Sequence, residues 1–225
     1  SERSLRNRDW IEGNRLKVLE ATNGRAGYVY VPNTAGAGYE YFTRYYFSQL
    51  DMDGVIVDER FNGGGHLADF IVDMLDRPFV NFWTNRSESF DVAPTASIFG
   101  PKVMLINENA GSGGDWLPYA FQKRELGPLV GKRTWGGLVG YSGTPPLIDG
   151  GGITIPNWAI FSEDGSWIIE NYGVAPDVEV QQMPKDVIAG RDPQLEKAIQ
   201  IINRDLQNYT PPTPNPDPRP KRATR

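Results

Sequence analysis

The feature that most constrains the fold is a repeated alternation of short β-branched runs with longer helix-like segments. The runs are each short enough to be one buried strand: Gly27–Val31, Gly54–Asp58 and Lys102–Asn107. Each run precedes a segment with helical character: Tyr39–Leu50, Leu67–Leu75 and Asp115–Arg124. This alternation is typical of βα units, in which helices join parallel strands. The sequence therefore predicts an α/β fold with a mostly parallel sheet.

The chain length predicts one core with appendages. With 225 residues, the chain can bury one sizeable core, which we assign to residues 27–208. We interpret residues 1–26 as a lead-in segment that follows an upstream domain. Residues 209–225 are rich in proline and predict an extended tail. The last helix of the core is predicted to begin after an Asp192 cap, with Pro193 in its first position.

A small β-rich segment precedes that helix. Between residues 147 and 180 the pattern changes to short strands separated by glycine turns. The Asp-Gly turn within Glu163–Gly165 predicts a hairpin that pairs Trp158–Phe161 with Ser166–Glu170.

Composition excludes several classes of function. The net charge is −5, and the basic residues are scattered, so we expect no nucleic-acid partner. No run of 18 apolar residues occurs, which excludes a membrane-spanning helix in this sequence. The absence of cysteine excludes a disulfide framework, a thiolate nucleophile and a cysteine-bound metal. We expect neither a metal nor a cofactor.

Ser112 lies in a glycine-rich segment between a predicted strand and a predicted helix. The segment reads Ala110-Gly111-Ser112-Gly113-Gly114 and nearly matches the G-x-S-x-G nucleophile elbow, with alanine in the first glycine position. Small neighbours let the chain turn sharply and leave the hydroxyl accessible, while the helix amino terminus favours negative charge nearby. A phosphate-binding or purely structural turn is the alternative reading of this motif.

A second glycine run, Gly63-Gly64-Gly65-His66, follows the preceding predicted strand. The two loops should meet at the same edge of a parallel sheet. Glycine amides at that edge could donate to a substrate oxygen and form an oxyanion hole. A flexible turn without function is the alternative reading.

His66 is the only histidine in the chain, and this limits the sources of a general base for Ser112. An α/β-hydrolase would need a histidine after the serine, and none follows it. A chymotrypsin-like arrangement would require an all-β chain. His66 could act as the base only if its loop aimed it at Ser112, and we favour a satisfied or substrate-facing histidine.

Four motifs together resemble the carboxy-terminal domain of the tricorn core proteases over nearly the whole chain. They are Asp58-Glu59-Arg60-Phe61-Asn62-Gly63-Gly64-Gly65, Asn107-Glu108-Asn109-Ala110-Gly111-Ser112, Gly131-Lys132-Arg133-Thr134-Trp135-Gly136-Gly137 and Glu170-Asn171-Tyr172-Gly173-Val174-Ala175-Pro176-Asp177. The wider family includes the carboxy-terminal processing proteases. The resemblance implies a ββα spiral like that of crotonase and Clp protease.

The resemblance also implies roles for individual residues. Ser112 matches the nucleophile, Glu170 matches a glutamate of the catalytic tetrad, and the amides of Gly65 and Gly113 match the oxyanion hole. The general base in such proteases is a histidine from an earlier domain, which a PDZ-like domain separates from this one. Processing proteases use a lysine instead, but the matching position here is Gly137.

Three further residues are expected to contact substrate. Gly64 and His66 belong to the loop that should line the substrate groove. Trp83 matches an acidic residue that attracts basic side chains in tricorn proteases. An indole at this position favours neutral or aromatic residues in the first subsite.

These inferences lead to one main hypothesis. The chain is predicted to hydrolyse peptides through an acyl-enzyme on Ser112, with the base supplied by an upstream domain and with a homo-oligomeric assembly. One alternative is a catalytically silent peptide-binding or scaffold domain of the same fold. Crotonase-like thioester chemistry is another, and it would need a nucleotide pocket. The compartment stays open between cytoplasm and periplasm.

Overall fold

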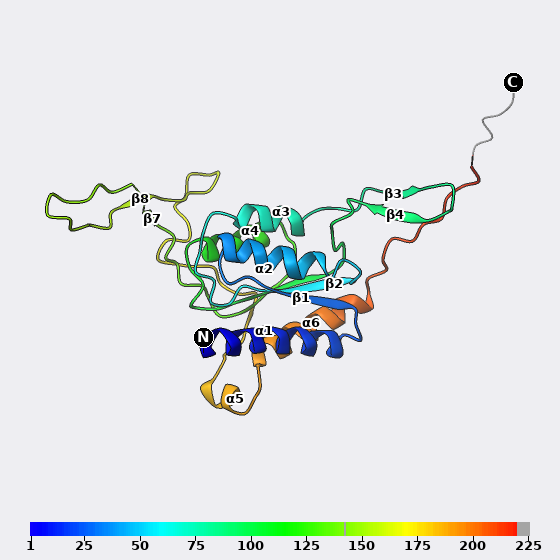
Figure 1. The fold of residues 1–225 in the computed structure, drawn as a ribbon, viewed down its shortest axis with the longest axis horizontal. Coiled ribbons are helices and arrows are strands. Elements are labelled where there is room, and N and C mark those ends of the chain that lie inside the picture. Colours follow the sequence, from blue (N-terminus) through cyan, green and yellow to red (C-terminus); the bar gives the residue numbers. More distant parts are fainter. Residues whose placement is uncertain (142, 220–225) are drawn as a thin grey trace, which may run out of the picture.

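A five-stranded parallel sheet forms the centre of the molecule (Figure 1). The computed structural model describes residues 1–141 and 143–219. The strands lie in the order in which they occur in the sequence: β1 (Ala26–Tyr30), β2 (Gly54–Asp58), β5 (Lys102–Ile106), β6 (Leu129–Gly131) and β9 (Val178–Glu179). Each neighbouring pair is parallel. The predicted α/β fold with a mostly parallel sheet is confirmed.

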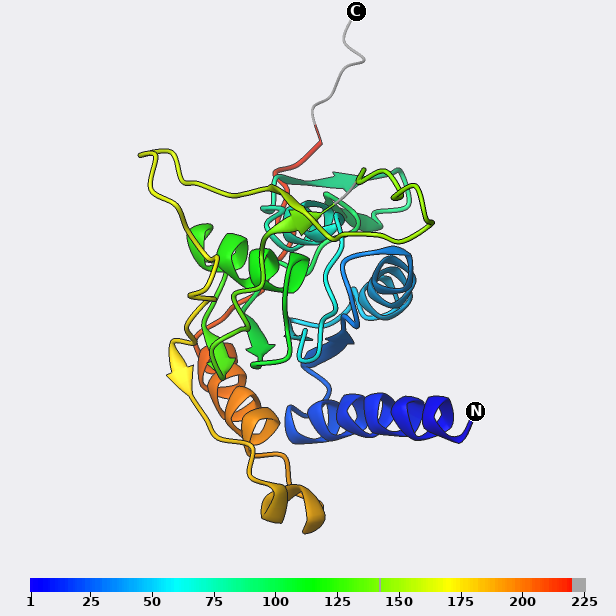
Figure 2. The ribbon, with the colours of Figure 1, turned by 90° about the vertical axis from the view of Figure 1, so that its left-hand side faces the viewer.

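Helices cover both faces of this sheet (Figures 1 and 2). One face carries the connecting helices α2 (Gly36–Phe47), α3 (Ala68–Leu75) and α4 (Gly113–Lys123). Successive strands advance in one direction across the sheet, so right-handed crossovers bring these helices to the same side. The other face carries α1 (Glu2–Ala21) and α6 (Pro193–Gln207). Because both faces are covered, β1, β2, β5 and β6 are buried at every residue.

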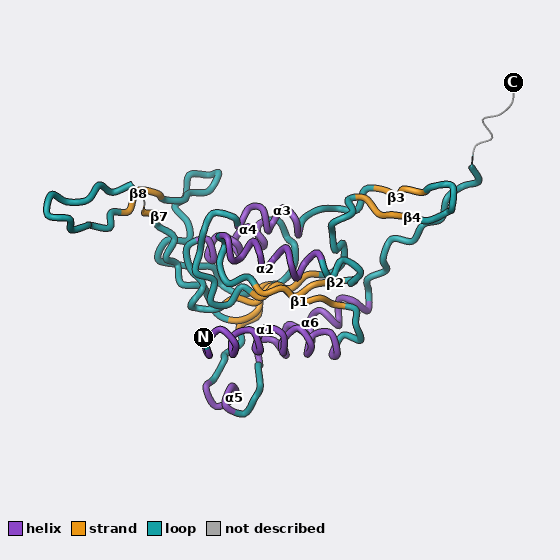
Figure 3. The backbone as a smooth tube through the Cα atoms, in the orientation of Figure 1, coloured by secondary structure: helices purple, strands orange, loops and turns teal. Residues whose placement is uncertain are grey.

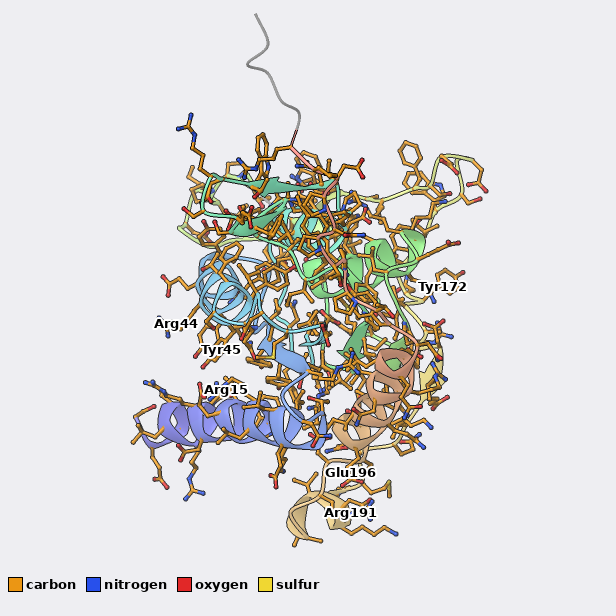
Figure 4. The ribbon with its side chains drawn as sticks, turned by 90° about the vertical axis from the view of Figure 1, so that its right-hand side faces the viewer. Arg15, Arg44, Tyr45, Tyr172, Arg191 and Glu196 are labelled. Atoms are coloured by element: carbon orange, nitrogen blue, oxygen red, sulfur yellow. The ribbon has the colours of Figure 1, made fainter. Side chains whose placement is uncertain are left out.

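The lead-in segment is largely helical, which the sequence patterns did not predict. Helix α1 is rich in charged residues, and few of its side chains, Ile11 and Val18 among them, are buried. Polar contacts add to its packing: Glu12 accepts from the Tyr45 hydroxyl of α2 and from Arg15 at 2.9 Å. Tyr45 and Arg15 lie between the two helices in Figure 4. The domain boundary at residue 26 stays a prediction.

Helix α6 begins as predicted, with Asp192 as its cap and Pro193 first. The Asp192 carboxylate accepts from the Leu195 amide at 3.0 Å. The same carboxylate accepts two hydrogen bonds, each 2.9 Å, from the guanidinium of Arg60. Arg60 also pairs with Asp58 at 2.7 Å, and the three side chains are almost fully buried. This network fixes α6 to the carboxyl end of β2. Beside it, Arg191 and Glu196 form an exposed ion pair (Figure 4).

Two antiparallel arms project from opposite ends of the sheet (Figure 1). One is the hairpin of β3 (Asn81–Thr84) and β4 (Phe90–Ala93), and the other pairs β7 (Gly140–Tyr141) with β8 (Pro156–Trp158). The predicted turn at residues 163–165 is present, and its flanking segments pair through one bridge, Phe161 with Trp167. The Ser162 amide also donates to the Ser166 carbonyl at 2.9 Å, and the Ile168 amide to the Ile160 carbonyl at 3.3 Å. The hairpin is therefore present but shorter than predicted, because Trp158 pairs with β7 instead.

The segment after β9 contains a short helix, α5 (Pro184–Ile188), before α6. Residues 209–219 after α6 form no helix or strand, and they run beside the β3–β4 hairpin, where Arg219 donates to the Asn85 carbonyl (Figure 1). The rest of the predicted tail, residues 220–225, lies outside the described residues. In the described part of the chain, no helix combines the length and apolarity needed to cross a bilayer.

Candidate active site

Ser112 lies in the sharp turn between β5 and α4, where the sequence predicted it. Its φ of 57° is in the left-handed region, which non-glycine residues rarely adopt. The turn requires small neighbours. A Cβ on Gly111 would lie 2.5 Å from the Trp135 ring, and one on Gly64 would lie 2.7 Å from the Ser112 Cβ. Gly64 is thus buried directly against Ser112, rather than exposed as a groove surface.

The glycine loop after β2 brings Gly65 against Gly113. A Cβ on Gly113 would lie 2.8 Å from the Gly65 nitrogen, so the two backbones are in contact. The amides of Gly63, Gly64 and Gly111 each donate to an acceptor within the protein. By contrast, the amides of Gly65 and Gly113 have no acceptor among the described residues. Two adjacent free N–H groups beside a serine can bind an oxygen that gains negative charge.

A cavity of about 1080 Å³ opens over these loops. It brings together five of the residues that the sequence singled out: Ser112, Gly65, Gly113, His66 and Glu170. Large apolar side chains form much of its remaining wall: Trp116, Trp135, Leu138, Trp158 and Ile160. Sequence reasoning missed these residues as a group, because they come from α4 and from two segments without a clear period.

Glu170 lines the cavity from a strained segment. Its neighbours Ile169 and Asn171 have φ values of 70° and 64°, and positive φ is particularly unfavourable for a β-branched residue such as isoleucine. Glu170 is half-buried, and its Oε2 atom is buried without a hydrogen-bond partner among the described residues. An unpaired buried carboxylate oxygen is costly, and it indicates a donor supplied by a bound group or another segment.

His66 is exposed at the cavity rim. No hydrogen bond joins it to Ser112 in the part of the chain that the structure describes. Gly137, which carries no side chain, also lines the cavity. Among the described residues, neither position therefore supplies a base that is already hydrogen-bonded to Ser112.

Trp83 does not reach this cavity. It lies on the β3–β4 hairpin, opposite Asp91, and is 65% exposed. That hairpin belongs to the connection leading into the amino end of β5, whereas the cavity lies at the carboxyl ends of β2 and β5. The hairpin projects from the end of the sheet (Figure 1), so Trp83 does not line the cavity of this chain, and its role in the first subsite stays a prediction.

Two buried acids lie behind the loops, and sequence reasoning missed both. Asp115 accepts from the Ser112 amide and from the Gly136 amide, each at 2.7 Å. The spacing of Ser112 and Asp115 is that of a helix capping box, a signal that could have identified the acid. Burial raises the pKa of Asp115, and hydrogen bonds from Thr134, Gly136 and Ser112 oppose that shift.

Glu59, the second acid, is fully buried, and neither of its carboxyl oxygens has a hydrogen-bond partner among the described residues. Burial raises the pKa of Glu59 well above its usual range, and Asp115 and Asp58 raise it further. Burial therefore favours the neutral form of this carboxyl.

Comparisons with known proteins agree on one family. The profile of peptidase family S41 matches residues 25–180. The chain is 38% identical over 213 residues to the tricorn protease of Thermoplasma acidophilum, which covers 95% of this chain and 20% of that protein. It is 30% identical over 161 residues to a carboxyl-terminal-processing protease of Synechocystis, covering 67% of this chain and 37% of that protein. The crystal structure of the tricorn protease matches with a TM-score of 0.86 and 39% identity, over 92% of this chain and 20% of that one.

Proposed function

The chain belongs to peptidase family S41, and we propose that it is the nucleophile-bearing part of a tricorn-like serine peptidase. One observation carries the proposal: Ser112, two free amides and an unpaired carboxylate oxygen of Glu170 surround one cavity. The chain spans about a fifth of the tricorn protease that it matches, so the remaining parts of the catalytic machinery are expected in other segments.

Peptide hydrolysis at this site would proceed in two steps. The Ser112 Oγ attacks the scissile carbonyl carbon, and the general base takes the hydroxyl proton. The carbonyl oxygen, now negative, accepts from the Gly65 and Gly113 amides, each worth about 3 kcal/mol to the transition state. The C–N bond breaks as the base returns the proton to the leaving amine. Water then hydrolyses the ester on Ser112 by the same route and regenerates the hydroxyl.

The base in this proposal is a histidine from an upstream domain, with a PDZ-like domain between the two, and the active protein is a homo-oligomer. Ser112 lines the open cavity, and the unpaired Glu170 oxygen could accept a hydrogen bond from the residues that hold that histidine. Replacing His66 by Phe tests this assignment. Activity within a few-fold of wild type is expected, whereas complete loss with retained inhibitor binding would make His66 the base.

The wall of the cavity supports a preference for neutral or aromatic residues in the first subsite. Trp116, Leu138 and Ile160 provide apolar surface there. Fluorogenic peptides that differ only at the cleaved position test this preference. Strong selectivity for Lys or Arg would contradict it. That result would indicate that a carboxylate such as Asp69 binds the basic side chain.

The second candidate function is a peptide-binding or scaffold domain without activity. The absence of a base bonded to Ser112 among the described residues favours this reading. Labelling with a fluorophosphonate separates the two, because only an activated serine reacts rapidly. We expect the full-length protein to be labelled at Ser112, and Ser112→Ala to lose both labelling and hydrolysis without a lower melting temperature. Hydrolysis retained within a few-fold in Ser112→Ala would remove Ser112 as nucleophile.

A further inference from the structure

The Asp115 side chain is fully buried and connects two separate segments of the cavity wall. Its Oδ2 accepts from the Ser112 amide and its Oδ1 from the Gly136 amide, both at 2.7 Å. Ser112 precedes α4, whereas Gly136 lies in the irregular segment after β6. One carboxylate therefore joins the start of α4 to a residue 21 positions further along the chain than Asp115 itself.

The first connection fixes the backbone of Ser112. The Ser112 carbonyl accepts from the amides of Asp115 and Trp116, at 2.9 and 3.1 Å. The Asp115 carboxylate takes the Ser112 amide, so both polar groups of this residue are bound to the first turn of α4. Since the φ of Ser112 is 57°, a conformation that surrounding contacts must enforce, these bonds determine where its side chain points.

The second connection reaches the segment that carries Glu170. The Gly136 carbonyl accepts from the Asn171 amide at 2.9 Å. A Cβ on Gly136 would lie 2.6 Å from the Gly173 nitrogen, so the two backbones are in direct contact. Asn171 follows Glu170 immediately, and hence a displacement of Gly136 would move Glu170 relative to Ser112.

We propose that Asp115 is a positioning residue that sets the separation of Ser112 and Glu170 across the cavity. This proposal rests on the proposed peptidase function. A helix cap needs one acceptor, and the second oxygen of Asp115 is used for a segment outside the helix. Replacement by asparagine keeps the shape but leaves one acceptor, so an NH2 group must face a buried N–H donor.

The test compares Asp115→Asn with Asp177→Asn, a change at an exposed aspartate, in the full-length protein. Asp177 also accepts from a backbone amide, that of Leu129 at 2.7 Å, and from Gln122 at 3.1 Å, but it does not line the cavity. We expect Asp115→Asn to lower kcat about 10- to 100-fold with KM within about threefold. Asp177→Asn should leave both values unchanged within about twofold. Unchanged kcat per folded molecule in Asp115→Asn would overturn the proposal.

A double-mutant cycle distinguishes positioning from a general structural role. If Asp115 acts by placing Glu170 opposite Ser112, combining Asp115→Asn with Glu170→Gln should be at most about threefold slower than the slower single variant. Multiplicative losses would overturn the proposal. Failure of the peptidase function itself would appear separately, as activity retained in Ser112→Ala.

Amide hydrogen exchange tests the proposal in the wild-type protein. Because no variant is needed, misfolding of a variant cannot affect the result. The amides of Ser112, Gly136 and Asn171 should be protected and should exchange together, because one connected network holds them. Rapid exchange of Ser112 or Gly136 while Asn171 stays protected would overturn the proposal.

Discussion

The two sides of the cavity are built in different ways. The Ser112 side consists of two glycine loops at the ends of buried parallel strands, and these loops touch each other through backbone atoms. The Glu170 side belongs to residues 132–177, which are mostly loop (Figure 3) and carry exposed aromatic rings such as Trp158 and Trp167. The first side takes its geometry from the sheet. The second side depends on a few hydrogen bonds to the first, so the two should respond differently to substitution.

The largest effect is expected from Gly65→Ala, on the side that the sheet fixes. Gly65 has a φ of 138°, and a Cβ there would lie 2.2 Å from the Thr34 carbonyl oxygen. The loop must shift, which misplaces one oxyanion donor, and we expect kcat to fall about 10²–10³-fold with a lower melting temperature. Gly63→Ala is the matched control, since nothing lies within 4 Å of its added carbon. Equal activity of the two variants would show that this loop is not the oxyanion hole.

An intermediate effect is expected from Glu170→Gln, on the side held by hydrogen bonds. The amide keeps the shape but removes the charge of a group with one unpaired buried oxygen. We expect kcat to fall about 10- to 100-fold, less than for Ser112→Ala, because an orienting group matters less than the nucleophile. The melting temperature should not change, nor should activity in the exposed control Glu163→Gln. A complete loss of activity together with a large drop in melting temperature would identify Glu170 as structural.

The smallest effect is expected from Glu59→Gln. The quantity that should change is the stability of the fold rather than kcat. The pKa of Glu59 is raised in the folded protein, so folded molecules hold this proton more strongly than unfolded ones. Stability is therefore lost progressively as the pH rises above the usual range of a glutamate, about 4.3. Glutamine cannot ionise, so the melting temperature of Glu59→Gln relative to wild type should increase between pH 5 and pH 8.

The exposed Glu108 provides a control for this pH dependence. Glu108→Gln should follow the wild-type melting curve at every pH. A pH-independent difference between Glu59→Gln and wild type would mean that Glu59 is already ionised in the folded state, and hence that the Ser112 side tolerates an extra buried charge.

The difference between the two sides also explains what the sequence could predict. The strand ends near Asp58 and Ile106 follow clear β-branched runs, so their loops and Ser112 could be placed from pattern alone. Helix α1 was missed because it is rich in charged residues and its apolar stripe is weak. The hairpin around residue 164 forms but is shorter than predicted, because a local turn signal does not reveal that Trp158 pairs with Gly140 instead. Glu170 came only from the family resemblance, since no local period marks its strained segment.

The Arg60 network makes the Ser112 side depend on the far end of the chain. Arg60 lies three residues before Gly63, the first residue of the glycine loop, and two of its hydrogen bonds go to Asp192, 132 residues later. Closing a loop of this length costs conformational entropy before the contact can form. During synthesis, the Arg60 guanidinium has only the Asp58 carboxylate of this network as a partner until Asp192 has been made. We therefore expect a chain that ends at residue 190 to show a protease-sensitive glycine loop. The peptidase site would then stay unassembled in nascent chains, and limited proteolysis of the truncated and complete proteins would detect it.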